Sequence, residues 1–177
     1  HSSGELIYRL IKEAGWKITS NIADCLFTAI STDTGSFQYP TTLPATYYAA
    51  GELVKKGANL EKVCNEVYQS YPLSRVKLLQ KVYNNFKLIE ENQIAYFWLK
   101  KKDFEKTGAT ESDTEGLIDH VRAIKPVIVA CVFEELNPEL VRISLRSKDK
   151  NVNVSDIAGK FGGGGHQAAA GARIAGK

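Results

Sequence analysis

The chain has 177 residues, enough for one large domain or two small ones, and 44% of them are apolar against 24% charged, as in an ordinary globular protein. No apolar run is long enough to cross a bilayer, the first residues do not read as a signal peptide, and three scattered cysteines argue against a disulfide framework or a zinc site. We therefore predict a cytoplasmic protein, whose net charge of +3 permits an anionic ligand without indicating a nucleic-acid binder.

The first half of the chain reads as four helices joined by short turns. Ser2 and Glu5 have the spacing of a capping box, and the helix that they begin should end at Gly15. Residues 36–39 are expected to be a short extended piece that stops at a proline. The other three helices are expected from Thr19 or Ser20 to about Ile30, from near Thr42 to before Gly57, and from Asn59 to about Gln69.

The second half of the chain is predicted to contain strands as well as helices. Residues 74–92 carry the apolar spacing of one long helix, which we expect to connect two domains. The run Lys100, Lys101, Lys102 is interpreted as a solvated turn. Further elements are predicted as buried strands over 94–99 and 127–133, a helix over 112–124 with a capping box of Ser112 and Glu115, an alternating strand over 141–147, and a short helix over 154–161.

The predicted fold class is therefore α/β, in two domains. Residues 1–70 form the mostly helical end of a first domain, and residues 71–92 form the connector helix. Residues 93–177 form a small α+β domain with a mixed sheet. The sequence contains no methionine, and we interpret the chain as a fragment of a longer protein, with His1 either native or left from a tag.

Asp33 is the first candidate for a functional residue. It stands between small hydroxyl residues in the stretch Ser-Thr-Asp-Thr-Gly, at the expected end of the second helix. An Asx-type turn that ends a helix uses the same residues, so the pattern fits a purely structural role. It also fits a metal-ligating or general-base carboxylate, but one aspartate cannot hold a catalytic ion by itself. Both interpretations stay open at this point.

The second candidate is the run Gly162, Gly163, Gly164, Gly165 and His166. Backbone amides that lack side chains can approach a phosphate closely, and glycine tolerates the left-handed geometry of an anion-binding nest. The histidine adds a donor that can be charged or neutral near pH 7. A flexible linker is the plain alternative. The run lies between a predicted helix and an apolar segment, and it lacks the Lys-Ser/Thr of a P-loop.

Arg146 and Ser147 are the third candidate. Arg146 ends the alternating strand and faces away from the apolar side chains of that strand, and Ser147 adds a hydroxyl group. The planar guanidinium group of arginine suits a phosphate. A strand-end arginine on a solvated face is also common, so this pattern alone leaves the role open.

Three stretches together resemble the DHH family of phosphoesterases: AISTDTGSF (29–37), SDTEGLIDHVRAIKPVIVACVFEE (112–135) and VRISLRSKDKNVNVSDIAGKFGGGGHQAAAGARI (141–174). Within that family they resemble the oligoribonuclease and pAp-phosphatase group, which is related to the RecJ exonucleases. The resemblance implies an N-terminal parallel-sheet domain, of which residues 1–70 are the last part, and a DHH-associated domain that grips the phosphate and the nucleotide of the substrate.

The resemblance also implies roles for individual residues. By position, Asp33 matches the last metal-ligating aspartate of the family, and Arg146, beside Ser147, matches a contact to the substrate phosphate. The Gly162–Gly165 loop and His166 match the substrate-binding loop. The implied cofactor is a pair of manganese ions, and the implied partner is a nucleotide or a short single-stranded RNA or DNA; we also consider a homodimer.

The family's early metal-binding motifs, including Asp-His-His, are absent from this sequence. The implied reaction is two-metal hydrolysis of a phosphate ester. We therefore expect the chain to carry the nucleotide-binding half of the enzyme and to be inactive alone.

Two alternatives stay open. One is a non-catalytic nucleic-acid-binding module like the related domain of alanyl-tRNA synthetases, against which the Thr-Asp-Thr-Gly stretch argues. The other is a fragment of a cyclic dinucleotide phosphodiesterase.

Overall fold

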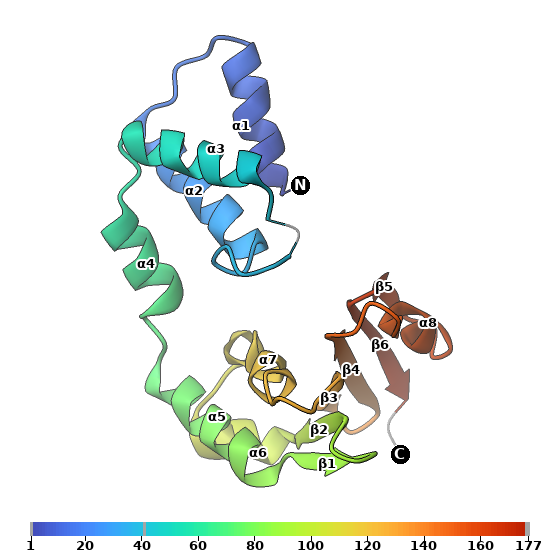
Figure 1. Cartoon of the computed structure of the whole chain (residues 1–177). Coiled ribbons are helices and arrows are strands. Elements are labelled where there is room, and N and C mark those ends of the chain that lie inside the picture. Colours follow the sequence, from blue (N-terminus) through green and yellow to red (C-terminus); the bar gives the residue numbers. More distant parts are fainter. Residues whose placement is uncertain (1, 41, 176–177) are drawn as a thin grey trace. The chain divides into compact units, whose positions relative to one another are not determined.

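The computed structural model of the chain describes residues 2–40 and 42–175. Contacts within the chain divide it into two compact units, His1–Tyr71 and Pro72–Lys177 (Figure 1). The first unit is helical and the second is a six-stranded mixed sheet with helices, so the predicted α/β class is confirmed. Within the described ranges, no helix combines the length and the apolar character that a membrane span needs.

Three of the four helices of the first unit begin at the predicted caps, Ser2, Thr19 and Asn59; the third begins after Leu43, which makes no side-chain cap bond. The Oγ atom of Ser2 accepts a hydrogen bond from the backbone N–H of Glu5 at 3.0 Å, and Asn59 caps the fourth helix in the same way at Lys62. Ile30 and Leu53 are fully buried in the core between the helices. The helices are α1 (Ser3–Glu13), α2 (Ser20–Asp33), α3 (Pro44–Lys55) and α4 (Leu60–Tyr68).

The expectation of an extended piece over residues 36–39 is wrong. These residues form a tight turn, in which Ser36 and Phe37 have φ angles of 57° and 63° and follow Gly35 at 57°. Three successive left-handed residues are uncommon and must be held by their surroundings. Here the Oγ1 atom of Thr34 accepts from the backbone N–H of Phe37 at 3.0 Å, which closes the turn.

The second unit is organised by a sheet with the strand order β1-β2-β3-β4-β6-β5. Strands β2 and β3 are parallel, and every other neighbouring pair is antiparallel. Its elements are α5 (Leu73–Asn85), β1 (Lys87–Ile89), β2 (Ile94–Leu99), α6 (Lys101–Thr107), the 3-10 helix η1 (Glu111–Thr114), α7 (Leu117–Arg122), β3 (Val129–Asn137), β4 (Leu140–Ser147), α8 (Val154–Gly159), β5 (Gly164–His166) and β6 (Ala169–Ala175).

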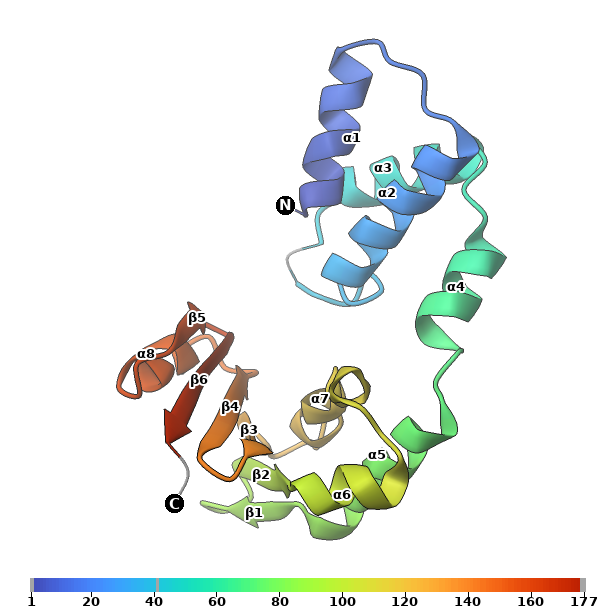
Figure 2. The ribbon, with the colours of Figure 1, turned by 180° about the vertical axis from the view of Figure 1, so that it is seen from behind.

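Different helices cover the two faces of this sheet (Figures 1 and 2). Helices α5 and α7 pack on one face, against a core that includes Phe97 of β2 and Val132 of β3. Helix α8 packs on the other face, against a core that includes Ile143 and Leu145 of β4. The odd-numbered side chains of β4 are therefore used by the core beneath α8, and the even-numbered side chains face the opposite way.

The connector helix expected up to residue 92 ends earlier, at Asn85. Phe86 turns the backbone to an extended conformation, and Lys87–Ile89 form β1, which pairs with β2 across a turn of three residues at positive φ. Helix α5 buries Leu78 and Val82 in the core of the second unit. It is therefore a structural part of that unit, whereas the assignment of residues 1–70 to a phosphoesterase domain stays a prediction.

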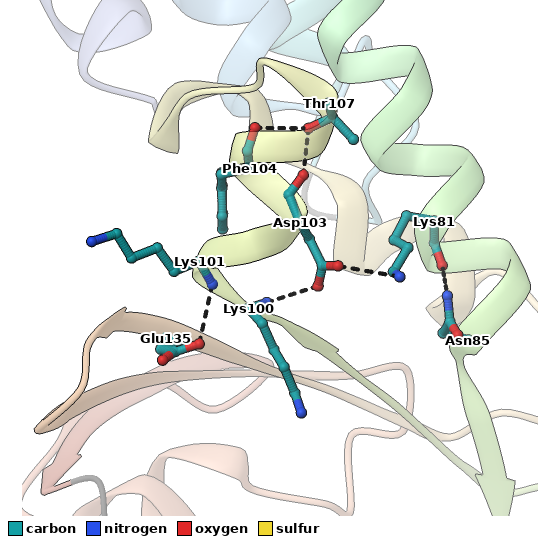
Figure 3. Close-up of polar contacts among 8 residues, drawn as sticks. All are labelled: Lys81, Asn85, Lys100, Lys101, Asp103, Phe104, Thr107 and Glu135. Atoms are coloured by element: carbon teal, nitrogen blue, oxygen red, sulfur yellow. Dashed lines mark hydrogen bonds and ion pairs between the residues drawn. The ribbon is translucent and has the colours of Figure 1, made fainter.

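Two further expectations in this unit are wrong. The lysine run begins α6 instead of forming a turn, because Asp103 Oδ2 accepts from the backbone N–H of Lys100 at 3.0 Å (Figure 3). The helix over 112–124 is split into η1 and α7 at Gly116, which has a φ of 73°. The capping box lies at the start of η1 and uses Thr110 and Asp113 instead of Ser112 and Glu115: Asp113 Oδ2 accepts from the backbone N–H of Thr110 at 2.8 Å.

Asp103 provides a test of how α6 is held. Its carboxylate is buried, caps the helix and lies 3.2 Å from Lys81 Nζ on α5. Substitution Asp103→Ala removes the cap and leaves Lys81 without this partner, so we expect the free energy of unfolding to fall by about 1 to 3 kcal/mol. Urea denaturation followed by circular dichroism measures this change. Unchanged stability would show that the carboxylate is not the cap of α6.

Candidate functional site

The register of β4, β6 and β5 places polar side chains in rows on one face of the sheet. Arg146 of β4 lies opposite Ala169 of β6, and Ala169 lies opposite His166 of β5. Directly opposed residues of antiparallel strands project from the same face. Neighbouring strands are about 4.8 Å apart. The side chains of Arg146 and His166 therefore flank a single alanine on one face.

The neighbouring row is made of small residues. Ser144 lies opposite Gly171, and Gly171 lies opposite Gly164. The row after that pairs Arg142 with Arg173. The small residues Ala169, Ser144, Gly171 and Gly164 thus form a shallow surface, which we call the floor. Arginine and histidine side chains surround it. This arrangement can receive a flat, anionic ligand without a steric barrier.

Two adjacent hollows lie on this face. One of about 490 Å³ lies between β4 and the loop that contains η1, and its lining includes Arg142, Ser144 and Arg146. The other, of about 370 Å³, is also lined by Arg142 and Ser144, and on its far side by Gly162 and Gly163. Because they share two residues of β4, the hollows bring Arg146 and the first two glycines of the loop to one region of the sheet.

The two arginines of β4 differ in their electrostatic surroundings. Arg142 donates to Glu134 Oε2 at 2.7 Å and to Glu111 Oε1 at 2.5 Å. Burial alone would lower the pKa of Arg142, but the hydrogen bonds and charges of Glu134 and Glu111 hold this pKa above its ordinary value. Arg142 is therefore a fixed cation that ties the η1 loop to the sheet.

Arg146, unlike Arg142, is available to bind a ligand. Its Nη1 atom donates to the carbonyl oxygen of Leu145 at 3.0 Å, and among the described residues it has no carboxylate partner. The residues opposite it in the sheet are Ala130 and Ala169, which leave room beside the guanidinium group. An arginine without a carboxylate partner, in a half-open hollow, suits a phosphate or a carboxylate.

The glycine run is ordered structure, so the linker interpretation is wrong. Gly164 and Gly165, with His166, form strand β5, and Ser155 Oγ on α8 donates to the carbonyl oxygen of Gly165 at 3.0 Å. A Cβ atom at Gly163 would collide with the carbonyl oxygen of Gly171 and would lie 2.6 Å from the Cβ atom of Ala172. The fold itself therefore requires glycine at 163.

Gly164 is different from Gly163. Its φ is not in the left-handed region, and a Cβ atom there would meet no atom within 4 Å. Nothing in the packing of the described chain therefore requires glycine at this position. Gly164 lies opposite Gly171, in the row between those of Arg146 and Arg142, so an added methyl group would project from the face that carries Arg146.

Ser147 is not brought to the hollows. Its side chain is buried on the opposite face of the sheet, where Oγ donates to the carbonyl oxygen of Asp149 at 3.0 Å and accepts from the N–H of Asp149 at 3.1 Å. Its role as a substrate contact remains a prediction, and this geometry argues against it. The sequence-based prediction missed Arg142 and Ser144, which the period-two alternation around Arg146 would have indicated.

Asp33 lies in the first unit, as the exposed last residue of α2. Its hydroxyl neighbours bond elsewhere: Thr34 Oγ1 donates to the carbonyl oxygen of Ile30 at 2.8 Å, and Ser31 Oγ lies 2.6 Å from the Tyr68 hydroxyl. These bonds fix the turn after α2, while Asp33 itself stays accessible to solvent.

The described residues do not provide a manganese site. No three histidine, cysteine, aspartate or glutamate side chains among them are grouped so as to hold a metal ion. A catalytic ion needs several protein ligands, and Asp33 alone does not fit this requirement. No chemical step can therefore be assigned to a metal held by these residues.

Comparisons with known proteins identify the family of the chain. A family model described as the DHHA1 domain matches residues 77–177. The bifunctional oligoribonuclease and PAP phosphatase NrnA of Bacillus subtilis is 35% identical over 98% of this chain and 55% of its own length. The corresponding protein of Mycoplasma genitalium is 33% identical over 98% of this chain and 52% of its own length.

A solved structure also matches. An exopolyphosphatase-related protein from Bacteroides fragilis superimposes with a TM-score of 0.88 at 33% identity, over 96% of this chain and 50% of that one. The chain thus spans about half the length of the relatives that it matches.

Substitutions of two neighbouring glycines test which part of the loop the fold requires. We expect Gly163→Ala to lower the free energy of unfolding by about 1 to 3 kcal/mol, because the methyl group collides with β6. Gly164→Ala should change it by no more than about 0.5 kcal/mol, because the space is open. Chemical denaturation of both variants measures the difference. Equal losses would show that the loop packs differently.

Proposed function

Because the chain belongs to the DHHA1 family, through residues 77–177, we propose that its second unit binds the phosphate-bearing nucleotide of a phosphoesterase substrate. Family membership confirms the resemblance found in the sequence. The single observation that carries the proposal is the row of Arg146, Ala169 and His166 on one open face, beside the glycine run.

Each part of this face has a proposed task. The guanidinium group of Arg146 makes a paired contact with phosphate oxygens, and the His166 imidazole donates from the other side of Ala169. The backbone at Gly162 and Gly163 lines the neighbouring hollow, where the absence of side chains leaves room for an anion; the two N–H groups themselves donate to the carbonyl oxygens of Gly159 and Ala158. Arg142, held by its two glutamates, keeps the η1 wall in place and is a positioning residue.

For the whole protein we propose hydrolysis of short oligoribonucleotides and of 3′-phosphoadenosine 5′-phosphate, the activities that the Bacillus subtilis relative's name gives. A pair of manganese ions is the proposed cofactor of that reaction. Asp33 would contribute one carboxylate to a metal site whose other ligands lie outside the described residues. A carboxylate at the C-terminal end of α2 adds to the negative end of the helix dipole, which favours a nearby cation.

The matches to the two oligoribonuclease and PAP phosphatase relatives each cover 98% of this chain and so run through both units, which supports a phosphoesterase over a non-catalytic nucleic-acid-binding module. A cyclic dinucleotide phosphodiesterase remains a second candidate within the same class. Titration with a cyclic dinucleotide beside 3′-phosphoadenosine 5′-phosphate distinguishes the two, because the preferred ligand binds more tightly.

Nucleotide binding tests the proposed face. We expect isothermal titration calorimetry with 3′-phosphoadenosine 5′-phosphate to show at least tenfold weaker binding for Arg146→Ala and for His166→Ala, since each removes a donor to phosphate; tenfold corresponds to about 1.4 kcal/mol. Gly164→Ala, which we expect to leave the stability unchanged, should also bind more weakly, because its methyl group would stand on the ligand face. The matched control is Arg122→Ala on α7, which lines neither hollow and pairs with Asp119. Unchanged affinity in the first two variants contradicts the proposal.

Hydrolysis tests the division of labour. We expect this 177-residue chain, with manganese added, to bind 3′-phosphoadenosine 5′-phosphate without releasing inorganic phosphate, because its described residues hold no metal cluster. Phosphate release is followed by a colorimetric assay, in parallel with Asp33→Ala. Turnover by the chain that disappears in Asp33→Ala would overturn the expected inactivity. Binding and turnover are measured separately, so either result can fail alone.

A further inference from the structure

A third hollow, of about 460 Å³, lies at the edge of β2. Strand β1 pairs with β2 only from Ile94 to Tyr96, so among the described residues no strand covers this edge from Phe97 onward. The ends of α5 and α6 border the uncovered stretch (Figure 3). Apart from the buried Phe97, this hollow shares no lining residue with those beside Arg146.

The hollow is strongly basic. Four lysines line it, Lys81, Lys87, Lys100 and Lys102, against one carboxylate, Asp103. That carboxylate is buried, caps α6 and pairs with Lys81 (Figure 3). The other three lysines are exposed and form no ion pair with any described residue. Three charges are therefore left for an anionic ligand.

No carboxylate of the described residues forms an ion pair with Lys87, Lys100 or Lys102. Glu135 of β3 accepts from the backbone N–H of Lys101 at 3.1 Å (Figure 3). In the same view the side chain of Lys100 extends away from Asp103. The glutamate is thus engaged at the start of α6, and within the described chain it forms no ion pair with Lys87, Lys100 or Lys102.

An aromatic ring completes the hollow. Trp98 of β2 lines it and is 45% exposed, although the ring stacks on Phe133 with centroids 4.5 Å apart and planes 18° apart. Phe133 is itself held edge-on by Tyr96 at 6.4 Å. One face of the indole is therefore held against Phe133, and part of the ring stays accessible to solvent. A pre-oriented ring loses little conformational entropy when it stacks on a ligand.

We propose that this hollow binds single-stranded nucleic acid, with one base stacked on Trp98 and the phosphates on either side of it near Lys87, Lys100 and Lys102. Aromatic stacking beside a basic groove is how proteins hold single strands without reading their sequence. Lysines that only protect a sheet edge from aggregation would not need an exposed tryptophan among them. Because the hollow shares no exposed residue with the Arg146 face, its binding is independent of the proposed phosphoesterase function.

Fluorescence tests the stacking. The chain has two tryptophans, so Trp16→Phe in the first unit leaves Trp98 as the single reporter. Titration with a single-stranded oligouridylate of about 12 nucleotides, within the range of known single-strand sites, should quench its emission. In the wild-type chain, Trp98→Leu should weaken binding by about fivefold or more in fluorescence anisotropy of the labelled oligonucleotide. Because that variant can lose stability, circular dichroism confirms its fold before binding is measured.

The contribution of the lysine charges is tested with substitutions of exposed residues, which do not change the core. The triple variant Lys87→Gln, Lys100→Gln, Lys102→Gln should bind about tenfold more weakly, or worse, at low salt. The slope of log affinity against log salt should fall by about 0.7 for each phosphate that the protein no longer neutralises. The matched control, Lys77→Gln, Lys106→Gln, Lys125→Gln, removes the same charge from exposed lysines of this unit that do not line the hollow.

Four outcomes overturn the proposal. The first is an equal loss of affinity in both triple variants, which would mean a net-charge effect. The second is no change in Trp98 emission at saturating oligonucleotide. The third is a Trp98 signal that follows protein concentration instead of oligonucleotide, which would make this face an interface between copies. The fourth is loss of the quench in Arg146→Ala, which would place the strand on the other face.

Discussion

The antiparallel register of β4 against β6 governs both the core and the ligand face of the second unit. Ile143 and Leu145 project into the core beneath α8, and Arg142, Ser144 and Arg146 project to the hollows. Because side chains alternate with a period of two, a slip by one residue would exchange the two sets. The same apolar burial that stabilises the sheet therefore fixes the arginines on the open face.

Close approach of backbones gives the face its shape. Gly163 passes so near to Gly171 and Ala172 that no side chain fits between them, and this contact holds the glycine run against β6. Arg142 performs the equivalent task on the other side, where it joins Glu134 of the sheet to Glu111 of η1. Both borders of the floor are therefore held before a ligand arrives, which lowers the entropic cost of binding.

Local chemistry determined which features could be predicted from the sequence. The caps at Ser2 and Asn59 and the strands over 94–99 and 141–147 follow from side-chain bonds and alternation, and they were predicted correctly. The end of α5 was missed because Phe86 and Ile89 continue the helical apolar spacing of Val82. Local sequence patterns do not predict which distant strands pair with each other. Arg146 and the glycines stand out locally, whereas Glu134 becomes part of the face only through pairing of β3 with β4.

The start of α6 was hidden for a different reason, because its N-cap position holds a lysine, which is not a capping residue. The helices around it cover different parts of the sheet: on one face α5 packs beside β2 and α7 packs across β3 and β4, and on the other face α8 packs against β5 and β6. The face that carries Arg146 and the edge of β2 beside Trp98 are left uncovered and lie apart. Substitutions in one of these two regions thus need not be compensated in the other. Selection can therefore alter ligand preference at either region while the shared strands keep their packing.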